Sequence, residues 1–269
     1  RNTSSPSTAS GAKHSTSTIR NSSADTISTD KSTTMINPDT KQESWRLNKF
    51  VALCLGISRR KADELIEKGK ITIDGQPARL GQQISDANKI SYNGKLLELQ
   101  SKQLIILHKP TGYLCSRASQ GGVPTIYKLL PKNLHHLKPV GRLDKDSSGL
   151  ILMTNDGDFA HSMTHPSFYK IKRYLVTIDQ PLQPLHRQMI NDFGVQLPDG
   201  RSQLTLERQH EGDDYRWIVE MSEGRNRQIR RTFDALGYTV KKLHRTNFGN
   251  YSLGDLKRGE WREEKFTNS

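Results

Sequence analysis

Apolar residues recur at three- and four-residue steps soon after residue 44, a spacing typical of two consecutive short helices. The first helix is expected from Trp45 to about Gly56, with its apolar positions at Leu47, Phe50, Val51 and Cys54. Ser58 is a typical N-cap residue, and the helix that it begins should end by Gly69, with apolar positions at Ala62, Leu65 and Ile66.

The pattern then changes to the two-residue alternation of β-strands. Ile71 and Ile73 precede an Asp-Gly pair, and Ile90 and Tyr92 precede an Asn-Gly pair. Both pairs are typical of hairpin turns. The pattern predicts a small unit of two helices followed by strands, ending near residue 98.

Strands and helices alternate irregularly from residue 103 onward. The strand-like segments are QLIILHKP and RYLVTID, and the helical segments are GDFAHSMTH, PLHRQMINDF and RQIRRTFDALG. The regular strand, helix, strand repeat of a doubly wound sheet does not occur in this pattern. We therefore predict one α+β domain.

Composition separates a tail from these folded parts. Residues 1–40 contain 19 Ser or Thr and almost no aliphatic side chains, which is too little apolar surface to offset the conformational entropy lost on folding. We therefore expect a disordered tail, with Met35 as a candidate native start. A Ser-rich transit peptide is the competing interpretation, but the three Asp residues of this segment weaken it. The expected organisation is a tail over residues 1–40, a small unit over 41–100 and a larger domain over 101–269.

Charge and cysteine content narrow the classes of protein. The chain has 41 Lys and Arg against 28 Asp and Glu, a net charge of +13, and the tail, with four basic and three acidic residues, holds only +1 of it. This excess indicates a polyanionic partner such as nucleic acid or an anionic membrane surface. Cys54 and Cys115 are the only cysteines, which excludes a disulfide scaffold and a zinc finger and favours a reducing, cytoplasmic compartment. No apolar run reaches the ~18 residues that a membrane span needs, so we expect a soluble protein.

Basic side chains gather on the second predicted helix. Arg59, Arg60 and Lys61 occupy its first turn, and Lys68 lies near its end. Cations at a helix N-terminus oppose the helix dipole, so stability alone does not explain them. Helix N–H groups and basic side chains together favour a phosphate-binding surface; a merely solvated charged face is the alternative.

Two polar clusters lie in the larger domain. GRLDKDSSG, residues 141–149, runs directly into the apolar LILM, which would hold its side chains at the end of a buried strand; a plain surface loop is the alternative. A calcium-binding loop is rejected because Asn155 stands where such a loop needs a bidentate Glu. EGRNRQIRR, residues 223–231, forms a cationic cluster that could hold a carboxylate or a phosphate, or be a solvated basic helix. Its charge is extended by Lys241, Lys242, His244 and Arg245.

These segments resemble a known family. RLNKFVALCLGISRRKADELIEKGKITIDGQPA is similar to an S4 RNA-binding domain. With HKPTGYLCS, GRLDKDSSGLILMTNDGDFAH, KRYLV, EGRNRQIRRTF and VKKLHR in this order, the chain resembles the RsuA family of pseudouridine synthases over roughly residues 45–262. The resemblance implies a small S4 domain followed by a mixed, mainly antiparallel sheet with flanking helices, and conversion of uridine to pseudouridine without a cofactor or metal. The LCSR and HPS segments are more similar to the large-subunit rRNA, RluB-like branch than to the small-subunit one.

The resemblance also implies residue roles. Asp144 would be the catalytic carboxylate, either as nucleophile at ribose C1′ or as the base that leads to a glycal-like intermediate. Arg230 would be its basic partner, Tyr174 would stack on the extruded base, and Arg142 would fill the vacated stack. The RNA-facing basic positions of the S4 domain are matched by Arg59, Arg60, Lys61 and Lys68.

Other side chains of the motifs receive lesser roles. Lys109 and Pro110 are expected to shape the wall of the site, and Asp146 is the second-ranked carboxylate. His161 and His165 are four residues apart, but a structural or RNA-contacting role is favoured over metal binding.

The expected partner is ribosomal RNA or a ribosomal subunit precursor, bound by a monomer without a membrane or a small-molecule cofactor. A synthase that acts on small-subunit rRNA or tRNA is one alternative. A non-catalytic RNA-binding or ribosome-assembly factor that keeps the fold is another, and the complete set of Asp144, Tyr174 and Arg230 favours the enzyme.

Overall fold

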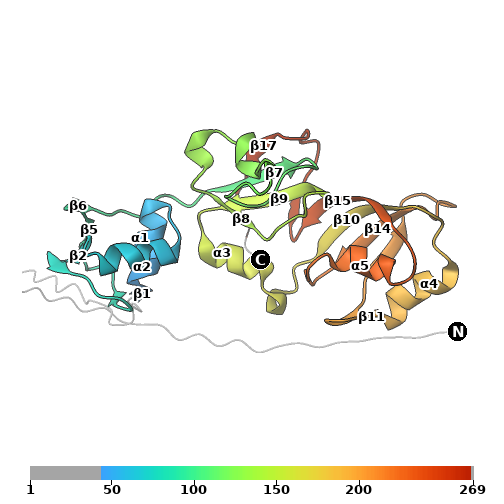
Figure 1. Ribbon diagram of the computed structural model, residues 1–269, viewed down its shortest axis with the longest axis horizontal. Coiled ribbons are helices and arrows are strands. Elements are labelled where there is room, and N and C mark those ends of the chain that lie inside the picture. The colour runs from blue at the N-terminus through green and yellow to red at the C-terminus, as the bar shows by residue number, and fades with distance from the viewer. Residues whose placement is uncertain (1–43, 268–269) are drawn as a thin grey trace, which may run out of the picture. The chain divides into compact units, whose positions relative to one another are not determined.

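A computed structural model describes residues 44–267 (Figure 1). The predicted tail, with Met35, lies outside the described residues. Residues 45–96 contain two helices and six short strands: β1 Trp45–Arg46, α1 Leu47–Leu55, α2 Arg59–Glu67, β2 Ile71–Ile73, β3 Gln76–Pro77, β4 Gln83–Ile84, β5 Ile90–Tyr92 and β6 Lys95–Leu96. Their buried side chains form an apolar cluster of their own, with members from α1, α2, β2, β4 and β5.

Local sequence signals set the helix boundaries of this N-terminal segment. Gly56 ends α1 in the left-handed conformation, with φ of 65°. The Ser58 hydroxyl accepts a hydrogen bond of 3.1 Å from the backbone N–H of Lys61 and caps α2. Both were expected from residue type.

The start of α1 corrects the prediction from periodicity. Trp45 and Arg46 are extended, not helical, because they pair antiparallel with Ile84 and Gln83 of β4, and the helix begins at Leu47. The turns are as predicted. Both residues of Asp74-Gly75 and of Asn93-Gly94 have positive φ, as type I′ turns require, and they close the β2–β3 and β5–β6 hairpins.

The larger part of the chain is built on one nine-stranded sheet in the order β13-β14-β10-β15-β9-β7-β17, with β16 paired to β15 and β8 to β9. The pair β9–β15 is parallel and the other pairs are antiparallel. This is the mixed, mainly antiparallel α+β fold that was expected. Its elements are β7 Leu104–Lys109, β8 Lys138–Val140, β9 Ser148–Thr154, α3 Gly157–Thr164, β10 Lys172–Ile178, α4 Pro184–Gln188, β13 Thr205–Arg208, β14 Arg216–Met221, α5 Gln228–Asp234, β15 Val240–Phe248, β16 Tyr251–Ser252 and β17 Trp261–Glu263, with a separate hairpin of β11 Val195–Leu197 and β12 Gly200–Ser202. Three 3₁₀ helices, Ile126–Leu129, Lys132–Leu134 and Pro166–Phe168, and a π-helix, Met189–Phe193, complete the described elements.

The strands β7 and β9 are buried on both faces, which explains their continuous apolar runs. Leu104 and Ile106 lie in one apolar cluster with Met163 of α3, while Ile105 and Leu107 lie in another, with residues of the 3₁₀ turns near 126–134. The loop that precedes β9 is therefore attached to a strand that packing holds from both sides.

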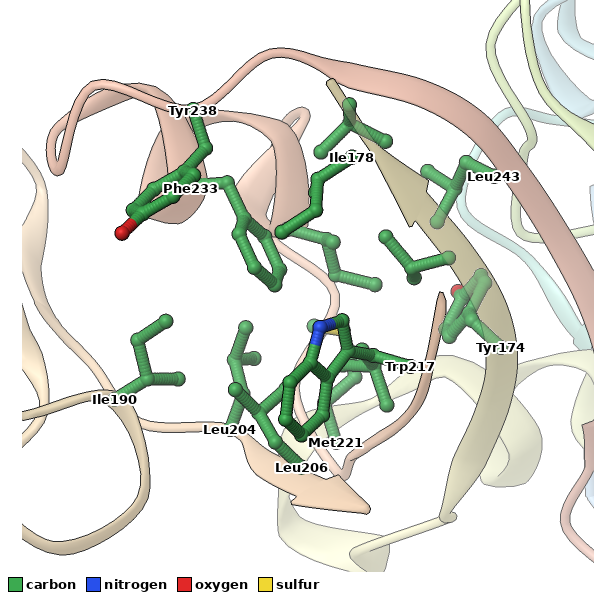
Figure 2. Packing of buried hydrophobic residues seen from close by; sticks show 14 of the residues in the cluster. Tyr174, Ile178, Ile190, Leu204, Leu206, Trp217, Met221, Phe233, Tyr238 and Leu243 are labelled. Atoms are coloured by element: carbon green, nitrogen blue, oxygen red, sulfur yellow. The ribbon is translucent and has the colours of Figure 1, made fainter. Parts of the chain in front are cut away.

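The other half of the sheet packs on a third apolar cluster (Figure 2). Trp217 of β14 and Phe233 of α5 are fully buried there, so α5 covers this face of the sheet. Tyr174 of β10 belongs to the same cluster and is 7% exposed. In the part of the chain that the structure describes, no helix is long and apolar enough to cross a membrane.

Candidate active site

The loop of residues 141–147 connects β8 to β9 and is held from beneath by a lysine. Lys109 is fully buried, and its Nζ donates hydrogen bonds to the carbonyl oxygens of Pro110, Asp144 and Ser147 at 3.1, 2.9 and 2.7 Å. Burial lowers the pKa of Lys109 below the ordinary lysine value. Lys109 was expected to shape the wall of the site. In the structure its ammonium holds the backbone on which Asp144 stands, and the side chain is not among those that line the cavity.

Two carboxylates of this loop face two arginines from the segment 225–231. Arg227 Nη1 lies 3.3 Å from Asp144 Oδ2 and 3.2 Å from Asp146 Oδ1, and Arg230 Nη2 lies 3.3 Å from Asp146 Oδ2. Burial raises the pKa of Asp146, but the hydrogen bond from Arg227 and the charge of Arg230 outweigh it and bring this pKa below its usual value. The four side chains form one ion-pair network at the end of β9.

The network differs from the expected pairing. Arg230 was expected to hold Asp144, but in the structure it pairs with the carboxylate of Asp146. It also donates hydrogen bonds to the backbone carbonyl oxygens of Asp146, at 3.1 Å, and Val240, at 2.7 Å. Asp144 instead pairs with Arg227. The reason is local geometry. Arg227 precedes α5 in the left-handed conformation, with φ of 47°, so the turn presents this side chain to the carboxylates while Arg230 is one turn further along the helix.

A cavity of about 260 Å³ lies beside this network. Its walls come from the loop 141–147, from β10 and β15, and from the turn 224–228. Drug-sized ligands occupy pockets of about 300–1,000 Å³, so this cavity suits a smaller guest such as one nucleotide. Asp144 and Tyr174 both line it, together with Arg142.

The structure brings the expected residues of the larger domain together. Tyr174 is buried in the same apolar cluster as Trp217 and Leu243 (Figure 2). Arg142 is exposed and makes no hydrogen bond or ion pair with another described side chain, as a residue that can enter a nucleic acid would. On the N-terminal segment, Arg59, Arg60, Lys61 and Lys68 are all exposed, the first three in the first turn of α2.

The structure adds two cavity residues that the sequence patterns did not single out as site residues. Lys172 is 8% exposed and donates to the carbonyl oxygens of Lys170, Ser222 and Glu223 at 3.3, 3.0 and 3.0 Å. Arg245, which was expected only to extend the basic charge of the segment 223–231, is 2% exposed, so its charge is buried. The alternation of side chains along a strand could have identified both residues. Lys172 is two residues from Tyr174 and Arg245 is two residues from buried Leu243, so each lies on the same face of its strand as a buried residue.

A loop that presents carboxylates beside a nucleotide-sized, cation-rich cavity is the arrangement expected of an enzyme that acts on a nucleotide. The family model for RNA pseudouridylate synthases matches residues 103–235, and the S4 domain model matches residues 45–96. The chain belongs to the RNA pseudouridylate synthase family and has an S4 domain before the synthase domain.

Known proteins show the same relationship over most of the chain. The ribosomal large subunit pseudouridine synthase B of Bacillus subtilis (strain 168) is 34% identical over 231 residues, which are 81% of this chain and 91% of that protein. The ribosomal small subunit pseudouridine synthase A of Pasteurella multocida (strain Pm70) is 35% identical over 221 residues, 81% of this chain and 94% of that protein. A crystal structure of a pseudouridylate synthase superposes with a TM-score of 0.59 at 33% identity and covers 82% of this chain and 96% of that one.

Proposed function

We propose that the protein converts one specific uridine of ribosomal RNA to pseudouridine and that Asp144 is its catalytic carboxylate. The observation that carries the proposal is the Asp144 side chain, ion-paired to Arg227 at the edge of a nucleotide-sized cavity that Tyr174 also lines. The names of the two relatives, one for each ribosomal subunit, support ribosomal RNA as the substrate class.

The chemistry requires an ionised carboxylate. The N1–C1′ bond of uridine breaks with its electron pair on the base, the base turns and C5 bonds to C1′. The C5 proton then leaves and N1 takes up a proton, so the product is an isomer of the substrate. Asp144 acts on the ribose, as nucleophile at C1′ or as the base that leads to a glycal-like intermediate. The guanidinium of Arg227 pairs with this carboxylate at 3.3 Å and fixes its direction.

The target base must leave its stack to reach this cavity. Extrusion costs a few kcal/mol, and stacking on an aromatic ring returns about 1–3 kcal/mol. Tyr174 supplies the ring inside the cavity, and the exposed Arg142 fills the place that the base leaves. Arg230 supports the site by binding Asp146 and the backbone of the same loop.

The S4 domain docks the RNA through the basic first turn of α2. We propose the large-subunit rRNA as the target, on the LCSR and HPS segments, and a monomer that works in the cytoplasm. Identities of 34% and 35% to a large-subunit and a small-subunit enzyme support both subunits equally, so the test must include both.

The test is tritium release from C5 of labelled uridine. Transcripts of both rRNAs of the source organism, and the corresponding subunit precursors, are incubated with the full chain. We expect release of one equivalent from the large-subunit substrate alone. Release from the small-subunit substrate alone overturns the choice of subunit, and release from neither overturns the enzymatic proposal in favour of a binding or assembly factor.

Loss of the α2 charges is expected to weaken RNA binding and its salt dependence. Each phosphate contact that is lost lowers the slope of log affinity against log salt by about 0.9, since fewer counterions are released. The change is Arg59, Arg60 and Lys61 to Gln together, and the measurement is rRNA affinity over a salt series. The matched control removes three exposed charges away from α2, at Arg79, Lys89 and Lys95. An unchanged slope in the α2 variant would show that this face is only solvated.

Activity is expected to fall as pH rises through about 8. Burial, and then the charge of Arg245, lower the pKa of Lys172 from 10.5 to about 8. Above that pH the side chain loses a donor and a positive charge that the cavity wall uses. In the unfolded chain Lys172 has the ordinary pKa of 10.5, so between pH 8 and 10.5 the unfolded state binds a proton that the folded state does not. Lys172 therefore makes the folded state more stable as pH rises through this range. The rate should therefore fall without unfolding.

The measurement is the pH profile of the single-turnover rate, with circular dichroism at each pH. In Lys172→Arg, whose guanidinium keeps its proton, the alkaline fall should move upward. An alkaline limb that stays in place in this variant would contradict the assignment.

A further inference from the structure

Three Lys or Arg side chains are buried within residues 44–267, and all three surround the candidate site: Lys109, Lys172 and Arg245. None of them has a carboxylate partner within the described chain. Lys109 and Lys172 each give three hydrogen bonds to carbonyl oxygens. Arg245 gives only one, from Nε to the Leu150 carbonyl oxygen at 2.8 Å.

The two terminal nitrogens of Arg245 have no hydrogen-bond partner among the described residues, and Nη2 is buried. Burying an ionised group with donors unmade is costly, and an arginine does not escape the cost by losing its proton. Arg245 lines the same cavity as Asp144 and Tyr174. Arg245 is thus a cavity-lining cation whose terminal donors no described residue occupies.

Strand pairing places Arg245 next to Tyr174. In the antiparallel register of β10 and β15, Tyr174 lies opposite Arg245 and Lys172 lies opposite Phe248. Three residues on β10, 172–174, thus lie opposite four on β15, 245–248, because the register shifts between Arg173 and Tyr174. A bulge of this kind re-aims side chains, and it lets Arg245 and Phe248, an odd number of residues apart, line the same cavity.

The position of Arg245 is fixed by close packing. The Phe248 ring centroid lies 4.9 Å from Arg245 Cζ and 5.1 Å from Lys172 Nζ. On the other side, β9 approaches β15 so closely that a Cβ on Gly149 would lie 2.2 Å from the Arg245 carbonyl oxygen. The guanidinium is therefore held in place before any substrate binds, the condition under which a charge stabilises a transition state most effectively.

We propose that Arg245 is a catalytic residue that donates a hydrogen bond to a carbonyl oxygen of the target uracil and stabilises the negative charge on the detached base. The proposal rests on the proposed function. When the N1–C1′ bond breaks, its electron pair stays on the uracil ring and spreads to O2 and O4; it returns to C1′ when the C5 bond forms. Arg245, a buried cation without a carboxylate partner, is paired with an anion only while the uracil is detached from the ribose. A residue that is 2% exposed cannot follow the backbone phosphates of a continuous RNA strand, whereas the exposed basic residues of α2 can.

The test compares Arg245→Gln with Arg262→Gln. Like Arg245, Arg262 donates to the backbone; it has two carbonyl acceptors where Arg245 has one, and it lies outside the cavity. The measurements are the single-turnover rate of tritium release, rRNA affinity over a salt series, and thermal melting. Loss of one preorganised donor to a developing oxyanion lowers rates by about 10²–10³-fold, so Arg245→Gln should lose about that factor with unchanged affinity. Arg262→Gln should keep the wild-type rate.

A second arm changes the leaving group. A synthetic RNA that spans the modified uridine is prepared with uridine or 5-fluorouridine at that position, and loss of the nucleoside is followed by digestion and mass spectrometry. Fluorine withdraws electrons and stabilises the uracil anion, so the defect of Arg245→Gln should shrink with 5-fluorouridine. Should Arg245→Gln not fold, Arg245→Lys, which keeps the charge but not the planar fork, decides by the same comparison.

Three results overturn the proposal: a rate equal to that of the wild type, a loss of equal size on both bases, or a weakened affinity with a smaller salt slope, which would assign Arg245 to a phosphate. Absence of tritium release from the wild-type protein is a different result, since it overturns the proposed function itself.

Discussion

Replacing Asp144 by Asn is expected to abolish tritium release while the protein remains folded. Asn keeps the shape and one oxygen for Arg227, but it cannot act on the ribose as nucleophile or base. Removal of an acid–base group typically costs about 10²–10⁴-fold, so we expect a loss of at least about 100-fold in the single-turnover rate. Affinity for rRNA should stay close to that of the wild type.

The matched control for Asp144→Asn is Asp146→Asn in the same loop. Asp146 pairs with both arginines and holds the network together, so its loss should lower stability and slow the reaction without abolishing it. Full activity of Asp144→Asn, or abolition by Asp146→Asn alone, would move the catalytic role to Asp146.

Replacing Lys109 by Met should destabilise the loop that holds Asp144. Met fills much of the same space but leaves the carbonyl oxygens of Pro110, Asp144 and Ser147 without their donor. An unsatisfied buried polar group costs about 1–3 kcal/mol, and we expect a total loss of about 3 kcal/mol in the free energy of unfolding. Urea denaturation measures this loss, and the single-turnover rate should fall with it.

Lys145 provides the control for Lys109. It lies in the same loop and is exposed, so Lys145→Met should change neither stability nor rate appreciably. A Lys109→Met protein as stable and as active as the wild type would show that the buried ammonium does not hold the loop.

Local signals predicted the parts of the fold that depend on neighbouring residues. The Ser58 cap, the left-handed Gly56 and the Asp-Gly and Asn-Gly turns each follow from residue type and backbone preference. Trp45 was assigned wrongly because its pairing partner, Ile84, lies 39 residues further along the chain.

The site could be predicted only in part for the same reason. The motifs brought Asp144, Tyr174 and the arginine segment into one proposal, and the structure places them around one cavity. Which arginine meets which carboxylate depends on the positive φ of Arg227, which residue type does not suggest. Burial of Arg245 depends on a register shift between β10 and β15 and on the contact with Gly149, two features that the order of residues does not display.

The most direct test of the central claim is mapping of pseudouridine in rRNA by carbodiimide treatment and reverse transcription. The rRNA would come from cells with the gene, without it, and without it but expressing the Asp144→Asn protein. We expect one reverse-transcription stop, in the large-subunit rRNA, to be present with the gene and absent from the other two. Identical stops in all three would contradict the account.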